Sequence, residues 1–364
     1  MDGFSHGHDM LPETQPVSFS VSDGFDAFLA AQNITIAATS YQSGRLYLAG
    51  RHPAGGLVLS EEYFSKAMGL HVHADDLYLL ADRHLVHLTN TVAEGNLSRG
   101  LFDKSFVPAA IHPTGDINGH DLAMAGDGRM IFVNTRSNCL STLTDDGDVA
   151  PVWSPAFLNG VQLGDRCHLN GLAIDGGASA YVTGMARSCK VNGWRRHRVD
   201  GGFVMDVQSN RVVAEGLSMP HSPRVHDGEL WVCNSGTGEL GVVDRQHGRF
   251  LPFAFFPGFI RGLAFHGNYA FVGLSRPRHA RFDGLPLHAR LAEDDLTPWT
   301  GIQIIDTTTA ETVAWFRIEG PVSELYDVAV LPGVGCAVAN GMLPQFYTPT
   351  AQDADLPSDR SLSA

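Results

Sequence analysis

Three histidines stand at or beside corresponding positions of similar short motifs, and they could do the most chemistry in this chain. His120 begins a His-Asp-Leu-Ala motif, His168 lies in the segment 167–173, and His221 follows a Met-Pro pair. Imidazole nitrogens bind Fe, Cu, Zn or Mn, and three protein ligands leave a coordination position for substrate or water. The pattern therefore predicts a divalent transition metal held by His120, His168 and His221.

Further copies of the motif supply a carboxylate, a cation and a phenol. Glu324 lies two residues before Tyr326, as His168 lies two residues before Asn170. We expect Glu324 to be a fourth metal ligand or to orient a histidine, with Arg261 and Tyr326 beside it as catalytic groups. Arg261 carries a fixed positive charge suited to a substrate carboxylate, and Asn170 is a second candidate for substrate binding.

The motifs recur with the same local pattern of a strand, a turn and a second strand. Gly126, Asp127 and Gly128, for example, separate the His120 copy from the strand 130–134. Repeats of short strands spaced by roughly 40 to 50 residues are typical of an all-β propeller in which each copy is one blade. Seven copies predict seven blades. Six is the alternative, because the copies at Ala37 and Tyr326 could share one closing blade.

In such a fold the first strand of each blade lines the central channel, and alternate residues of a strand point to the same side. The corresponding channel-facing positions are then Ala37, Met68, His120, Asn170, His221, Arg261 and Tyr326. His168 and Glu324 lie two residues earlier and are expected in a neighbouring layer. The repeats thus bring the candidate residues to one axis.

Composition supports a single packed domain. Hydrophobic residues make up 44% of the 364 residues and charged residues 18%, as in an ordinary globular core. We expect a flexible N-terminal tail over residues 1–16, one propeller domain over 17–343, and a C-terminal tail over 344–364.

The net charge of -14 argues against a nucleic-acid partner and against anionic lipid. The sequence has no apolar run long enough to span a bilayer and no signal-peptide pattern, so a cytoplasmic location without membrane attachment is expected. The five cysteines contain no CxxC pair and are expected to be buried free thiols. The oligomeric state stays open.

Two insertions interrupt the repeats, at residues 186–201 and 276–300. The first carries Trp194 and a basic cluster that includes Arg195, and the second carries Arg278 among other cations. Both follow the second strand of a blade, so they should emerge on one side of the disc. We expect them to form a partly cationic lid in which Arg195 and Arg278 bind a small-molecule or peptide substrate through its carboxylate or phosphate.

The motifs around His120, Cys167, His221, Arg261 and Glu324 resemble an uncharacterised bacterial family of conserved hypothetical proteins with a propeller fold. The segments 120–123 and 169–173 are also similar to strands of the gluconolactonase and regucalcin-like propellers. That resemblance implies a divalent metal near Asn170, and His120 in place of the family's Asn favours a softer metal than calcium. A histidine ring on a propeller axis is similar in architecture to the carotenoid oxygenases, which makes iron our first choice before Cu, Mn or Zn.

These observations predict a metal-dependent enzyme, an oxygenase, lyase or hydrolase, that acts on a small polar or anionic molecule at the channel. The alternative is a non-catalytic propeller that binds a ligand or a protein, in which the histidines are structural and hydrogen-bonded. The metal content of the purified protein separates the two readings.

Overall fold

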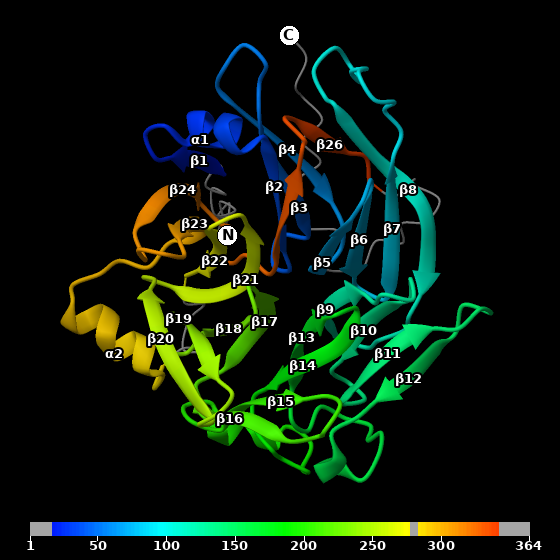
Figure 1. Ribbon diagram of the computed structural model, residues 1–364, viewed down its shortest axis with the longest axis vertical. Coiled ribbons are helices and arrows are strands. Elements are labelled where there is room, and N and C mark those ends of the chain that lie inside the picture. The colour runs from blue at the N-terminus through cyan, green and yellow to red at the C-terminus, as the bar shows by residue number, and fades with distance from the viewer. Residues whose placement is uncertain (1–16, 277–282, 342–364) are drawn as a thin grey trace, which may run out of the picture.

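Six antiparallel sheets surround one axis like the blades of a propeller (Figure 1). The computed structural model of the protein describes residues 17–276 and 283–341. In five blades the strands run in sequence order from the axis to the rim. The all-β propeller that the repeats predict is confirmed.

The blades are built as follows, each from its innermost strand outward. The first three blades are β25 (Val328–Pro332), β2 (Ile34–Ser40), β3 (Arg45–Arg51) and β4 (Leu57–Tyr63); β5 (Ala67–His73), β6 (Asp76–Ala81), β7 (His84–Asn90) and β8 (Lys104–Pro113); and β9 (Gly119–Met124), β10 (Met130–Asn134), β11 (Cys139–Leu143) and β12 (Val149–Trp153). The last three blades are β13 (Leu169–Asp175), β14 (Ala178–Gly184), β15 (Gly202–Asp206) and β16 (Val212–Leu217); β17 (Pro220–His226), β18 (Glu229–Asn234), β19 (Glu239–Asp244) and β20 (Arg249–Phe255); and β21 (Phe259–His266), β22 (Tyr269–Ser275), β23 (Thr300–Asp306) and β24 (Thr312–Glu319).

The number of blades is six rather than seven, because the two ends of the described chain share one blade. β25 pairs with β2, with Val328 opposite Ala38 and Pro332 opposite Ile34. The copies around Ala37 and Tyr326 therefore belong to one sheet, and Ala37 lies on its second strand instead of on the channel wall. Two short strands add to other blades: β1 (Ser18–Val21) pairs with β24, and β26 (Ala337–Ala339) runs parallel to β8.

The hydrophobic core lies between neighbouring blades. Every residue of β2 and of β10 is buried, because a blade is covered on both faces by its neighbours. On the outer strand β24 the burial alternates, with Ala314, Phe316 and Ile318 facing inward. Continuous apolar runs near the axis and alternating ones at the rim are what this packing requires.

Each innermost strand has, in it or next to it, one position that corresponds to the same position in the other blades. Around the axis this position is alternately a glycine and a residue whose side chain accepts a hydrogen bond. In three neighbouring pairs of blades a side chain reaches across. Asp327 Oδ2 accepts the backbone N–H of Leu70 at 2.9 Å, Asp121 Oδ2 that of Leu172 at 3.0 Å, and Ser222 Oγ that of Gly262 at 3.0 Å. The blades are thus tied in pairs by these hydrogen bonds.

In the other three blade contacts a glycine lets two backbones approach. A Cβ added to Gly69 would lie 3.0 Å from Asp121 Cα, and one added to Gly262 would lie 2.8 Å from Asp327 Cα. At Gly171 the added Cβ would lie 2.3 Å from Pro223 Cδ. Side chains at these positions would push neighbouring blades apart.

The two insertions contain the helical turn η2 (Gly193–His197) and the helix α2 (Pro286–Glu293). The repeat pattern gave no sign of α2, which begins with Pro286 in its first turn and buries Leu287 and Leu291 beside Phe255. A second helix, α1 (Phe25–Gln32), packs at the rim near β1 (Figure 1). Across the described ranges, neither α-helix has the length or the apolar character needed to span a bilayer.

We predict that Gly262→Ala destabilises the protein more than Gly267→Ala. Both glycines have positive φ, 82° and 54°, so each substitution carries a backbone penalty of about 1–2 kcal/mol. Only at position 262 does the new methyl group meet the next blade, which adds about 1–3 kcal/mol of overpacking. Nothing lies within 4 Å of a Cβ at Gly267. Equal free energies of unfolding for the two variants in denaturant titrations would refute this account of the blade contacts.

Candidate functional site

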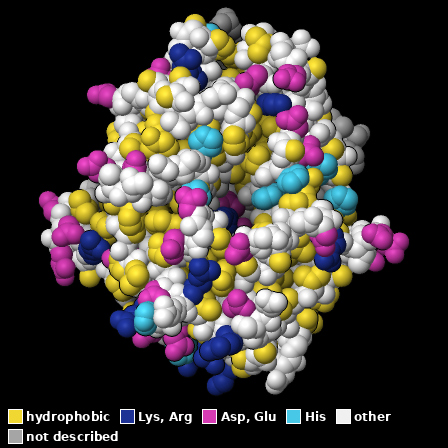
Figure 2. All heavy atoms as spheres, in the orientation of Figure 1, with side chains coloured by type: hydrophobic (Ala, Val, Ile, Leu, Met, Phe, Trp, Pro, Cys, Tyr) yellow, Lys and Arg dark blue, Asp and Glu magenta, His cyan; other side chains and the backbone are white. Residues whose placement is uncertain are grey.

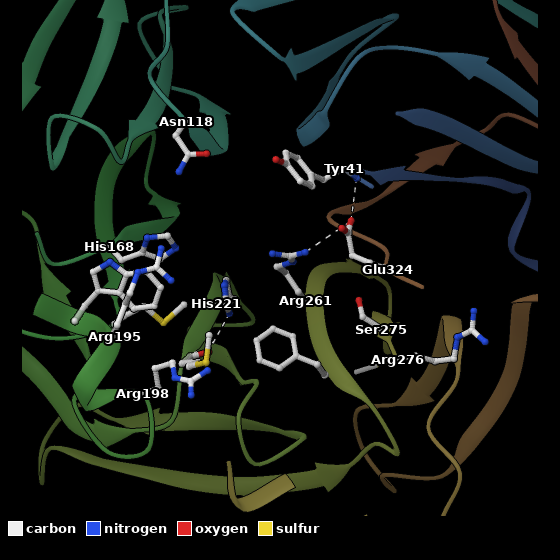
Figure 3. A pocket seen from close by; sticks show the side chains of 14 residues that line it. Tyr41, Asn118, His168, Arg195, Arg198, His221, Arg261, Ser275, Arg276 and Glu324 are labelled. Carbon is white, nitrogen blue, oxygen red and sulfur yellow. Dashed lines mark hydrogen bonds and ion pairs between the residues drawn. The ribbon is translucent and has the colours of Figure 1, made fainter. Parts of the chain in front are cut away.

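The start of the innermost strands brings the predicted residues to one mouth of the channel. A cavity of about 410 Å³ lies there, and its wall includes His168, His221, Arg261 and Glu324 (Figure 3). His168 and Glu324 belong to the outer layer of equivalent positions, together with Asn118, Met219 and Phe259. The period-two register read from the sequence therefore placed these two layers correctly.

Arg261 brings a largely buried positive charge to this cavity, with 16% of its side chain exposed. Its guanidinium lies 3.9 Å from the centre of the Tyr326 ring, and its Nη2 lies 3.7 Å from Glu324 Oε1. Glu324 Oε1 also accepts the backbone N–H of Tyr41 at 2.9 Å, which fixes the carboxylate (Figure 3). Burial lowers the pKa of Arg261 from an ordinary value far above neutrality, and Nε is buried without a hydrogen-bond partner in the described chain.

Hydrogen bonding fixes the tautomer of His120. Its Nδ1 lies 2.7 Å from the carbonyl oxygen of Asn118 and 2.9 Å from Thr135 Oγ1. The carbonyl can only accept, and Thr135 already donates its hydroxyl hydrogen to the carbonyl of Leu169 at 2.6 Å. The hydrogen therefore sits on Nδ1, and Nε2 is an acceptor with no partner among the described residues.

His221 has the same tautomer for the same reason. Its Nδ1 lies 2.9 Å from the carbonyl oxygen of Met219 and 2.9 Å from Ser235 Oγ, which itself donates to the carbonyl of Cys233. Burial and nearby Arg261 lower the pKa of His221 well below its usual value. Burial, followed by the field of His168, lowers the pKa of His120 in the same way. Both rings are neutral at pH 7.

His168 is backed by a carboxylate. Its Nδ1 lies 2.7 Å from Asp165 Oδ2, which also accepts the indole N–H of Trp194 at 3.0 Å. The imidazole stacks on Trp194 with 4.2 Å between ring centres, and it meets the His120 ring edge to face at 4.8 Å. Since a carboxylate only accepts, Nε2 of His168 is a third free acceptor.

The structure does not assemble these groups into a metal site. Within residues 17–276 and 283–341, no three His, Cys, Asp or Glu side chains are placed so that they could hold one ion. His120, His168 and His221 share the channel mouth with Glu324, but Arg261 lies beside them. The predicted metal and its identity stay predictions.

The other predicted residues fall into three groups. Arg195 lines the cavity, as expected, and Tyr326 lies buried beside Arg261 with no hydrogen-bond partner for its hydroxyl in the described chain. Asn170 does not line the cavity, because its amide donates to the carbonyl of Pro220 and accepts from Thr183 Oγ1. Arg278 lies outside the described residues.

Both insertions reach the same cavity, as their place after the second strand of a blade predicts. Arg195 and Arg198 come from the first insertion and Arg276 from the start of the second. The Arg276 guanidinium donates to the carbonyl of Val322 and points away from the cavity in Figure 3. Arg195 and Arg198 are therefore the insertion residues that bear on a ligand.

Sequence reasoning missed Asp165 and the role of Trp194. Asp165 precedes His168 by three residues in a loop, where no strand period marks it, and only the short spacing to His168 could have identified it. The apolar part of the cavity wall, formed by Met185, Met219 and Phe259, was also missed. Of the five cysteines, four are buried as expected and Cys189 is exposed.

Comparison with solved structures agrees with the propeller fold. A chain from a crystal structure of a nidogen/laminin complex is 9% identical, with 82% of this chain and 99% of that chain covered and a TM-score of 0.50. A streptogramin B lyase is 11% identical over 87% and 95% of the two chains, with a TM-score of 0.47. A luciferin-regenerating enzyme is 14% identical over 85% and 96%, with a TM-score of 0.39. At these identities only the first match, with its TM-score of 0.50, bears on the fold, and it bears on nothing else.

No curated protein matches the sequence significantly. One family model, described as "Domain of unknown function (DUF4915)", matches residues 23–339 and so spans most of the chain, including all six blades. The protein therefore belongs to the DUF4915 family, as the resemblance of its motifs to a family of conserved hypothetical propellers predicted.

Proposed function

We propose that the protein is an enzyme that binds a small organic anion at this mouth of its channel and moves a proton on that anion through His168. The observation that carries the proposal is the largely buried guanidinium of Arg261 on the cavity wall, beside the Tyr326 ring. A buried cation strongly favours a ligand of opposite charge, and a guanidinium matches a carboxylate or a phosphate in shape.

The charge around the cavity supports an anionic ligand. Four arginines and one glutamate line it, although the whole chain has a net charge of -14. Glu324 offsets one of these charges and Arg276 points away from the cavity, but Arg195 adds a second positive charge to that of Arg261. Local charge of this sign in an acidic protein is the pattern of an electrostatically focused site.

His168 is the group best arranged to accept a proton. A general base needs a free lone pair and a partner that stabilises its protonated form. His168 has both, because Nε2 is free and Asp165 lies 2.7 Å from Nδ1. In the proposed step a C–H bond next to the bound carboxylate or carbonyl group breaks, its proton goes to Nε2, and Arg261 stabilises the negative charge left on the substrate.

A metal-dependent form of the enzyme is the second candidate. It is favoured by one observation, that His120, His168 and His221 each donate from Nδ1 and leave Nε2 free. A histidine that binds a metal through one ring nitrogen usually donates a hydrogen bond from the other to a carbonyl or carboxylate oxygen. Fe, Cu, Mn or Zn would then polarise the bound anion or activate water.

We predict that small carboxylates bind to the wild-type protein and that Arg261→Gln weakens this binding by about 10- to 100-fold, the value of a hydrogen bond to a charged group. Isothermal titration with pyruvate, 2-oxoglutarate and their phosphate-bearing analogues measures it. Arg261→Lys, which keeps the charge, should lose less. If both variants bind these acids as the wild type does, Arg261 is not the anion site.

Proton transfer can be tested with the same acids in D2O. We expect the protein to speed exchange of the hydrogens next to the carbonyl group of 2-oxoglutarate, seen by proton NMR, and His168→Asn to lower that rate by about 100-fold while the affinity remains. Asp165→Asn should give a smaller loss. Binding without any faster exchange would indicate the non-catalytic alternative.

The two candidates also differ in metal content. The metal-free enzyme should contain far less than one equivalent of metal after purification and after anaerobic treatment with ferrous, cupric, manganous or zinc ions, as measured by mass spectrometry. The metal-dependent enzyme should retain about one equivalent, and His120→Gln or His221→Gln should remove it. Stoichiometric metal would overturn the metal-free form of the proposal.

We predict that the protein loses stability as the pH falls below 6.5. The unfolded chain protonates its histidines near that pH, whereas folded His120 and His221 stay neutral and the pKa of His71 is lowered to about 4 by burial. Burial raises the pKa of Asp327 to about 7, and its protonation in the folded state offsets one histidine. The net effect is about 2–3 kcal/mol per pH unit between pH 6 and 5. Denaturant titrations at several pH values measure how the free energy of unfolding changes with pH. His120→Gln should reduce this slope by the contribution of about one bound proton. If the slope were unchanged in His120→Gln, folded His120 would not be the neutral group that this prediction requires.

A further inference from the structure

A row of contacting aromatic rings runs along the site and begins at the first insertion. The Arg195 guanidinium lies 4.6 Å from the centre of the Trp194 ring, and Trp194 stacks on His168 at 4.2 Å. Arg195 is exposed and lines the cavity, whereas Trp194 is buried at 5% exposure. The outer end of the row thus presents a positive charge held against a rigid ring.

The same row ends on a second guanidinium deep in the channel. His168 contacts His120 at 4.8 Å between ring centres, His120 contacts Tyr326 at 5.7 Å, and Arg261 lies 3.9 Å from the Tyr326 ring centre. Two arginines, each on an aromatic face, therefore stand at opposite ends of one row of rings. His168, the proposed base, lies between them.

The outer cation is available to a ligand. No carboxylate of the described chain lies within ion-pair distance of Arg195, whose Nε makes one long hydrogen bond of 3.4 Å to Asn192 Oδ1. Arg198 lies on the same side of the cavity in Figure 3. Met185, Met219 and Phe259 also line the cavity. The cavity wall thus combines cations from two different elements with apolar side chains.

We infer that the substrate is an elongated molecule with an anionic group at each end, a dicarboxylate or a carboxylate that also bears a phosphate. This inference rests on the proposed anion site. One anionic group lies at Arg261, the other at Arg195 and Arg198, and the body lies against Trp194 and the apolar wall. This arrangement places the middle of the substrate beside His168. A monoanion of the same length uses only one of the two cationic ends.

Matched pairs of acids test this directly by isothermal titration. The probes are glutarate, adipate and suberate, each compared with the monocarboxylic acid of equal carbon number. We expect at least one diacid to bind about tenfold more tightly than its monoacid, the gain from one added charge-assisted contact. Arg195→Gln should abolish this gain and lower the affinity for the monoacid much less, whereas Arg261→Gln should weaken both.

Arg196→Gln is the matched control, because Arg196 is an exposed neighbour of Arg195 in the same turn and does not line this cavity. It changes the net charge equally and should leave both affinities as they are. The inference is overturned if no diacid gains over its monoacid, or if Arg195→Gln and Arg196→Gln act alike. If no acid binds the wild type, or Arg261→Gln has no effect on the monoacids, the proposed anion site itself fails. Thermal unfolding checks that each variant is folded.

Discussion

The buried ion cluster of Arg224, Asp121 and Asp327 is the interaction on which the channel depends. Arg224 donates from Nη1 to Asp121 Oδ2 at 2.8 Å and from Nη2 to Asp121 Oδ1 at 3.2 Å, and its Nη2 lies 3.6 Å from Asp327 Oδ1. Its remaining donors reach the carbonyl oxygens of Leu172 and Leu263. Because an unpaired buried charge is costly, these strands of different blades are held at fixed positions around one side chain. One guanidinium cannot fully compensate two carboxylates, and burial accordingly raises the pKa of Asp327.

This cluster lies between two cavities of different character. The proposed site at one mouth of the channel is rich in arginine and histidine. A second cavity of about 360 Å³ has Arg224 in its wall together with His71 and His226, and the rest of its lining is apolar. Figure 2 shows a hollow at the centre of one face, with histidines around it and charged side chains in its depth. The two cavities have no lining residue in common. A ligand in the proposed site would therefore contact only the residues of that site.

The sequence predicted the positions of residues that follow the alternation of a single strand. It missed residues whose positions depend on the closure of the propeller or on a loop. Alternation along the innermost strands was enough to place His120, His221 and Arg261 in one layer and His168 and Glu324 in the next. Ala37 was misplaced because only the pairing of β25 with β2, across the whole chain, decides which strand lines the channel. Asp165 lies in a loop with no period at all. Asn170 occupies a channel position, but Thr183 on the neighbouring strand and Pro220 of the next blade engage its amide, and such partners cannot be read from one motif.

Arg261 is the reason that we propose an anion rather than a metal ion as the ligand of this site. Two like unit charges roughly 5 Å apart repel by about 3 kcal/mol at an effective dielectric constant near 20, and a divalent ion doubles that repulsion. Burial is the main reason that the pKa values of His120 and His221 are lowered, and the charge of Arg261 adds to this effect. A metal would therefore have to overcome this repulsion, and in the described part of the chain the possible ligands are not placed around one point. The proposed anion would instead gain from Arg261 and leave the free Nε2 atoms to accept hydrogens, and for this reason the residues that predicted a metal from the sequence lead, once placed in space, to the proposal of an acid.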